Sequence, residues 1–170
     1  MIVQLCRLLV DIAVWRRGPQ DLPASSVLVA LLLVVYAMLG AIQVTIKGWP
    51  WLGSAGIMVC EVGLQALWLW GLLWFFGKRP RFLQTFAAYL GVGLLLTVAD
   101  LLVGGLLQFL GMAANSPSNP WPLLYFGLAL LSLGRILQQA LERSLMMGMA
   151  LTWVIMLTVV YVAQFITPLA

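Results

Sequence analysis

Five long apolar stretches constrain the fold of this chain more than any other feature. They cover about residues 27–44, 54–76, 82–111, 123–139 and 145–166. A helix needs about 20 apolar residues to cross the hydrocarbon core of a bilayer, and these stretches meet or approach that length. Only 8% of the residues are charged, against about 25% in soluble domains. The sequence therefore predicts an all-α, polytopic helical membrane protein with five spans, in which the 170 residues form a single integral membrane domain.

The segment before the first span, MIVQLCRLLVDIAVWRR at residues 1–17, predicts an amphipathic helix. Gln4, Arg7 and Asp11 recur at spacings of three and four residues, which places them on one face of a helix. The stretch is short for a span and holds two charges, so we expect it to lie in the membrane interface. A cleaved signal peptide is the alternative, but there the basic residues precede the apolar part, whereas Arg16 and Arg17 follow it.

The basic residues predict the orientation of the spans. Lys78-Arg79-Pro80-Arg81 forms a basic turn between the second and third spans, because proline fixes φ and removes a backbone donor. Loops rich in Lys and Arg stay on the cytoplasmic side. If the N-terminus is cytoplasmic and the C-terminus lies outside, Lys47 is the only cation on the outer side. The cations then expected inside, in contact with anionic headgroups, are Arg7, Arg16, Arg17, Lys78, Arg79, Arg81, Arg135 and Arg143.

Two carboxylates inside the predicted spans form the main candidate site. A carboxylate within a span is costly and is by default a functional hypothesis. At about 1.5 Å per residue from the basic turn, Glu61 and Asp100 lie at similar depths in the outer half of the bilayer. One hypothesis is a polar pocket with Gln65 and Gln108, reached by Lys47, in which the two carboxylates share a proton. The alternative is that each carboxylate reaches the outer interface and touches water.

Arg135 lies near the inner end of the fourth span. We expect its long side chain to snorkel towards the cytoplasmic headgroups. Besides phosphate groups, the partners that we expect for its guanidinium are the carboxylates of Glu142 and Asp11.

Small residues predict where helices approach closely. Ala87 with Gly91, and Gly148 with Thr152, are spaced for helix contact within the bundle, and a homodimer face is the alternative. The third stretch is longer than one crossing requires, and four of its residues are expected to bend or break it. They are Gly91, Gly93, Gly104 and Gly105.

The sequence holds no recognisable catalytic, metal-binding or cofactor-binding motif. It has no histidine, which is the most frequent general base and metal ligand. Cys6 and Cys60 are far apart, so neither a disulfide nor a C-x-x-C metal site is expected. G-x-S-x-G and H-E-x-x-H motifs are absent, and no basic patch is interleaved with exposed aromatic residues. We therefore expect no enzymatic activity, no cofactor and no nucleic-acid partner.

Two segments resemble a known family. Residues 76–89, FGKRPRFLQTFAAY, resemble the glycine, basic turn and Gln-Thr pair that lead into the third span of the Yip family, the Rab-interacting-protein-like membrane proteins. Residues 18–25, GPQDLPAS, are similar to the lead-in of its short bacterial members. The resemblance implies five closely spaced spans with a cytoplasmic N-terminus. In eukaryotic members it also implies vesicle traffic and small-GTPase partners.

Two functional hypotheses follow. The first is a non-enzymatic scaffold or partner-binding protein of the bacterial cytoplasmic (inner) membrane, which acts in membrane organisation or trafficking with a membrane-protein partner or as a homo-oligomer. The family resemblance, the amphipathic helix and the lack of catalytic groups motivate it. The second is a small transporter, or the membrane subunit of one. Glu61, Asp100 and the glycine-rich third span motivate it, because interrupted helices near polar groups often mark substrate sites.

Overall fold

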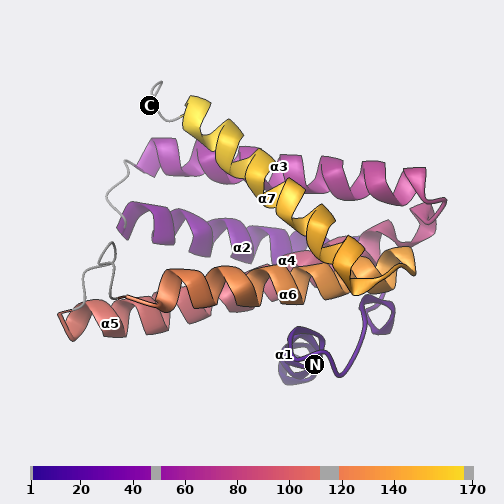
Figure 1. Cartoon of the computed structure of the whole chain (residues 1–170), viewed down its shortest axis with the longest axis horizontal. Coiled ribbons are helices and arrows are strands. Elements are labelled where there is room, and N and C mark those ends of the chain that lie inside the picture. Colours follow the sequence, from indigo (N-terminus) through magenta and orange to yellow (C-terminus); the bar gives the residue numbers. More distant parts are fainter. Residues whose placement is uncertain (1, 47–50, 112–118, 167–170) are drawn as a thin grey trace.

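The computed structural model describes residues 2–46, 51–111 and 119–166, and within them it has helices and turns but no strand. The long helices are α2 (Ser26–Ile46), α3 (Trp51–Phe75), α4 (Phe82–Ala99), α6 (Trp121–Leu141) and α7 (Leu145–Ile166). The short elements are α1 (Ile2–Ala13), the 3-10 turns η1 (Pro19–Asp21) and η2 (Arg79–Arg81), the π-helix η3 (Asp100–Gly104) and α5 (Gly105–Phe109). The long helices form one bundle, and α7 crosses obliquely over α3 (Figure 1).

The five predicted spans are confirmed, and the chain is a multi-pass membrane protein. Each span contains a helical stretch that is long and apolar enough to cross a bilayer. These stretches are Ser26–Gln43, Met58–Phe75, Arg79–Leu107, Trp121–Leu141 and Leu145–Val162. The predicted helix ends differ from the observed ones by about one turn or less.

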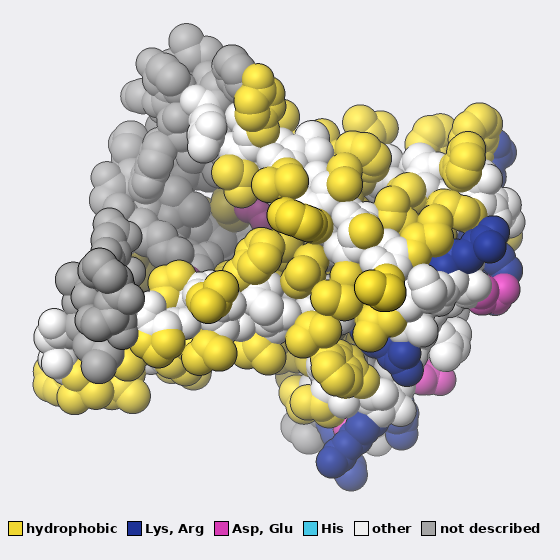
Figure 2. All heavy atoms as spheres, in the orientation of Figure 1, with side chains coloured by type: hydrophobic (Ala, Val, Ile, Leu, Met, Phe, Trp, Pro, Cys, Tyr) yellow, Lys and Arg dark blue, Asp and Glu magenta, His cyan; other side chains and the backbone are white. Residues whose placement is uncertain are grey.

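The surface of the bundle is apolar, as a hydrocarbon solvent requires. Val27, Phe75 and Met146 are more than three-quarters exposed, although each is a large hydrophobic residue. Apolar side chains cover much of the face shown in Figure 2, whereas basic side chains gather at one end of the bundle and on α1. The composition of the surface therefore separates a lipid-facing body from a charged end.

The third span contains a π-helix where a bend or break was expected. α4 continues into η3, which begins at Asp100, and then into α5, so the helix is continuous to Phe109. Gly104 ends the π-helix and Gly105 opens α5. A π turn adds one residue per turn and shifts the faces of the helix on either side of it, and such turns are frequent at functional sites.

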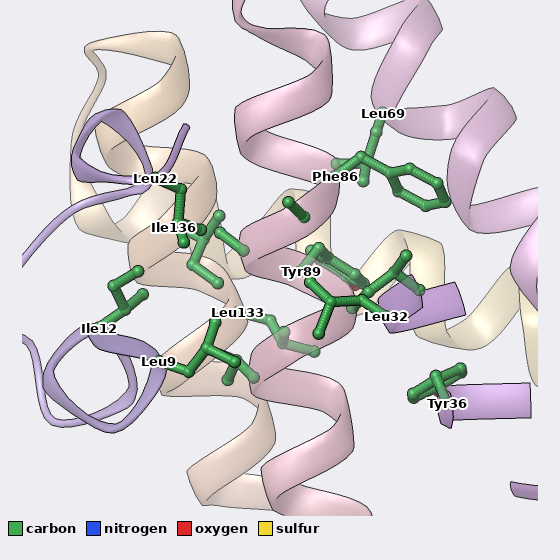
Figure 3. Close-up of a cluster of buried hydrophobic side chains, with 14 of the residues drawn as sticks. Leu9, Ile12, Leu22, Leu32, Tyr36, Leu69, Phe86, Tyr89, Leu133 and Ile136 are labelled. Atoms are coloured by element: carbon green, nitrogen blue, oxygen red, sulfur yellow. The ribbon is translucent and has the colours of Figure 1, made fainter. Parts of the chain in front are cut away.

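The core lies around α4, whose residues from Thr85 to Val92 are buried. Figure 3 shows side chains of the N-terminal segment meeting this core from one side, with Leu9, Ile12 and Leu22 close to Leu133 and Ile136 of α6. The predicted amphipathic helix is present as α1. It lies across the bundle, end-on in Figure 1, and packs on α4 and α6 while Gln4 and Arg7 remain exposed.

Two turns meet at what we call the hairpin end, residues 76–81 between α3 and α4 and residues 142–144 between α6 and α7. Glu142 ends α6 in a left-handed conformation with a φ of 54°. Its two carboxylate oxygens pair with different cations, Lys78 Nζ at 2.5 Å and Arg81 Nη2 at 2.7 Å. One carboxylate therefore ties the two turns together.

We expect this tie to make stability depend on pH. Hydrogen bonds from Lys78 and then Arg81 lower the pKa of Glu142 from its usual value. A lowered pKa in the folded state stabilises the fold above the unfolded pKa of about 4.3, and this stabilisation is lost as the pH falls through the folded pKa. Thermal unfolding of the detergent-purified chain should show a gap between wild type and Glu142→Gln at pH 6 that closes towards pH 3. A gap that is equal at both pH values would contradict the tie.

Candidate functional site

Glu61, in the middle of α3, is held by two neutral donors. The Tyr36 hydroxyl of α2 donates to Glu61 Oε1 at 2.7 Å, and the Gln65 amide, one turn further along α3, donates to the same oxygen at 3.0 Å. Tyr36 and Gln65 are only 9% and 8% exposed. No ion pair to Glu61 occurs within the described residues. The Glu61 carboxylate therefore lies inside a span, and its hydrogen-bond donors are polar but uncharged.

The other oxygen of Glu61 differs from the first. Because both donors converge on Oε1, Oε2 receives no hydrogen bond from the described part of the chain. Glu61 and Asp100 are the only acidic residues within the described spans.

Asp100 is held by donors from two other helices. The Gln43 side-chain amide of α2 donates to Asp100 Oδ2, and the Trp121 indole Nε1, in the first turn of α6, donates to Oδ1 at 2.8 Å. The Asn119 side chain in turn accepts a hydrogen bond from the Trp121 backbone N–H at 3.0 Å. Since Asp100 opens the π-helix, the irregular turn of the third span is fixed to both α2 and α6.

The hydrogen bonds of the described residues give each carboxylate its own donors, and a proton shared between Glu61 and Asp100 stays a prediction. α2 serves both clusters, because Tyr36 and Gln43 are seven residues apart and lie on one face of the helix. Tyr125 of α6 is within electrostatic reach of both Glu61 and Asp100. Gln65 belongs to the Glu61 cluster as expected. The side chain of Gln108 and the whole of Lys47 lie outside the part of the chain that the structure describes.

Arg135 has a different partner from those that the sequence predicted. Arg135 was expected to pair with Glu142 or Asp11, and this is wrong for the described residues. Glu142 takes Lys78 and Arg81, and Asp11 takes Arg17 at 3.6 Å. Arg135 instead donates to the side chain of Gln138, one turn along α6, while its Nε is buried without a partner among the described residues.

Four residues of the clusters were missed from the sequence. They are Tyr36, Gln43, Trp121 and Tyr125. The available signal was the seven-residue spacing of Tyr36 and Gln43, two polar groups on one face of an otherwise aliphatic span. Trp121 and Tyr125 carried no such signal, because aromatic residues near the end of a span are typical interface anchors.

The arrangement is suited to binding a proton or a cation. A carboxylate that accepts hydrogen bonds from neutral donors carries a negative charge into a medium where charge is costly, and a bound cation or proton relieves that cost. Within the described residues, no three His, Cys, Asp or Glu side chains come together. No family model, curated protein or solved structure matches the chain.

Proposed function

We propose that this protein is a non-enzymatic small transporter, or the membrane subunit of one, in which the Glu61 and Asp100 clusters bind protons or a small cation. The observation that carries the proposal is Glu61 in mid-span with both described donors on a single oxygen. The Glu61 side chain is only partly buried, and an oxygen that receives no hydrogen bond from the described residues is available to a proton or a cation. Oε2 is the atom at which a proton or cation binds.

The clusters also connect the helices that would move. Donors to the two carboxylates come from α2, α3 and α6, and Asp100 sits on the π-helix. Neutralising either carboxylate weakens charge-assisted hydrogen bonds, which are about twice as strong as neutral ones. Occupancy of the site is in this way coupled to the packing of α2 against its neighbours.

The proposal includes an orientation. The hairpin end faces the cytoplasm, the N-terminus is inside and the C-terminus outside, in the cytoplasmic membrane of a bacterium. The concentration of cations at the hairpin end supports this, by the positive-inside rule. Single cysteines at Gln20 and at Ser116, on a background without Cys6 and Cys60, test it. Gln20 should label only from the cytoplasmic side and Ser116 only from outside.

Partner binding in membrane organisation, as in the Yip family, is a second proposal. α1 supports it, because Cys6, Val10 and Val14 form an exposed stripe opposite the residues that pack on the bundle. Such a stripe is available to lipid, to a membrane-protein partner or to another copy of the chain. Loss of function on replacing Val10 and Val14 by serine, with the carboxylates intact, would favour this second role.

Proton movement into proteoliposomes tests the transport proposal. With a potassium diffusion potential and a pH-sensitive dye inside, the wild-type chain should acidify the lumen faster than protein-free vesicles. Glu61→Gln removes the titratable group but keeps an acceptor, so we expect the initial rate to fall about tenfold, as for loss of an acid–base group. Glu142→Gln, a carboxylate outside the spans, is the matched control and should stay near the wild-type rate. Wild-type vesicles that acidify no faster than empty ones, with either a potential or a cation gradient imposed, would refute the proposal.

A further inference from the structure

The hairpin end carries an excess of positive charge that its own carboxylate does not neutralise. Four cations and one anion leave a net charge of +3 there. The cations are Lys78, Arg79, Arg81 and Arg143. Glu142 pairs with Lys78 and Arg81, which are 30% and 40% exposed at their side chains. These two cations therefore have a partner inside the molecule.

The other two cations lie on aromatic rings. The guanidinium carbon of Arg79 is 5.1 Å from the centroid of the Trp74 ring, and that of Arg143 is 5.4 Å from the Phe76 ring. Both arginines are exposed, and neither forms an ion pair within the described residues. A guanidinium held over a ring by cation–π attraction keeps its N–H groups free to donate in the plane.

The rings also give these arginines a depth. Trp74 is 49% exposed at the end of an apolar span, and exposed tryptophans at span ends lie at headgroup level. Arginine binds phosphate through paired, charge-assisted hydrogen bonds, which suit a lipid phosphodiester at the same level. Both guanidinium groups, each close to an aromatic ring at the end of a span, are therefore placed to meet headgroup phosphates.

We propose that Arg79 on Trp74 and Arg143 on Phe76 form a binding surface for the phosphates of anionic phospholipids, whereas Lys78 and Arg81 hold the two turns together through Glu142. The two pairs carry equal charge and both lie at the hairpin end, but they have different tasks. Lipid binding here is independent of proton or cation binding in the bundle.

Titration of the detergent-purified full chain with short-chain phosphatidylglycerol, followed by calorimetry, tests this surface. A basic residue near an anionic surface contributes about fivefold, so Arg79→Gln with Arg143→Gln should raise the Kd roughly 25-fold. The charge-matched control, Lys78→Gln with Arg81→Gln, should change it less than about threefold. Trp74→Leu keeps every charge but removes one ring, and we expect a few-fold loss.

Several results would overturn the proposal. Equal losses in the two double variants would show that only the overall charge matters. Tight binding of short-chain phosphatidylcholine, or displacement of phosphatidylglycerol by equimolar inorganic phosphate, would show a site for something other than anionic lipid. If the Arg79 and Arg143 double variant does not fold, judged by thermal unfolding, each single variant should still raise the Kd about fivefold. No change in the singles or in Trp74→Leu would refute the surface.

Discussion

Replacing Gly148 by leucine should unfold this protein more effectively than almost any other single change. A side chain on Gly148 would run into the backbone carbonyl oxygen of Gly134 on α6, and its Cβ would also lie 3.0 Å from the backbone nitrogen of Gln138. Backbone atoms cannot rotate away as a flexible side chain can. From the other helix, a Cβ on Gly134 would meet the Cγ of Met149 at 2.9 Å and its backbone at 3.0 Å. The two glycines thus allow α6 and α7 to touch.

The size of the effect follows from the membrane setting. Lipid tails are as apolar as leucine, so helices associate through close packing and not through a hydrophobic driving force. Overpacking alone costs about 1–3 kcal/mol, which is our expectation for Gly148→Ala. For Gly148→Leu we expect the free energy of unfolding to fall by at least about 3 kcal/mol, because α7 must also separate from α6. Unfolding in mixed detergent micelles, followed by circular dichroism, measures both.

Glycines without neighbours provide the matched control. Gly63 and Gly71 lie in α3 and have nothing within 4 Å of an added Cβ. Alanine there should leave stability unchanged or raise it by up to about 1 kcal/mol, because glycine is the poorer helix former. If Gly148→Ala behaved like Gly63→Ala, the close contact between α6 and α7 would not exist in the folded protein.

The spans could be predicted because the hydropathy of a segment depends on whether lipid or water surrounds it, and not on which helices it packs against. Each long helix in a bilayer must be apolar nearly all round, so the apolar stretches revealed themselves without knowledge of their neighbours. The amphipathic α1 was readable for a similar reason, since the polar positions 4, 7 and 11 repeat with the helical period. What the sequence lacked was the rotation of each span about its axis. That rotation decides which polar side chains meet.

The partners of the two carboxylates could not be predicted, because the sequence does not give the rotation of each span. Depth along straight helices put Glu61 and Asp100 at one level, which suggested a shared proton. The structure gives each carboxylate an amide and an aromatic donor, and a single amide or aromatic residue in a span did not identify these partners. The π-helix at Asp100 shifts the face of the third span, and the glycines there predicted an irregularity but not its type. The pairing of Glu142 with Lys78 and Arg81 depended likewise on two turns far apart in sequence.

The second large effect concerns Glu61. Glu61→Ala removes the acceptor of both the Tyr36 hydroxyl and the Gln65 amide, which are nearly buried. Each of the two orphaned donors costs about 1–3 kcal/mol, so we expect the free energy of unfolding to fall by roughly 2–6 kcal/mol. Glu61→Gln keeps an oxygen in place and removes a charge from the span, so its stability should stay within about 1 kcal/mol of wild type.

A double-mutant cycle separates orphaned donors from simple loss of packing. Tyr36→Phe removes the hydroxyl that Glu61→Ala leaves without an acceptor, while keeping the ring. If the hydrogen bond dominates, adding Tyr36→Phe to Glu61→Ala should cost little or even restore about 1 kcal/mol, because the unsatisfied group is gone. Additive losses would mean that Glu61 acts mainly as a packed side chain. In that case the Tyr36 hydroxyl does not depend on the carboxylate, and Oε1 would be as available to a proton or cation as Oε2.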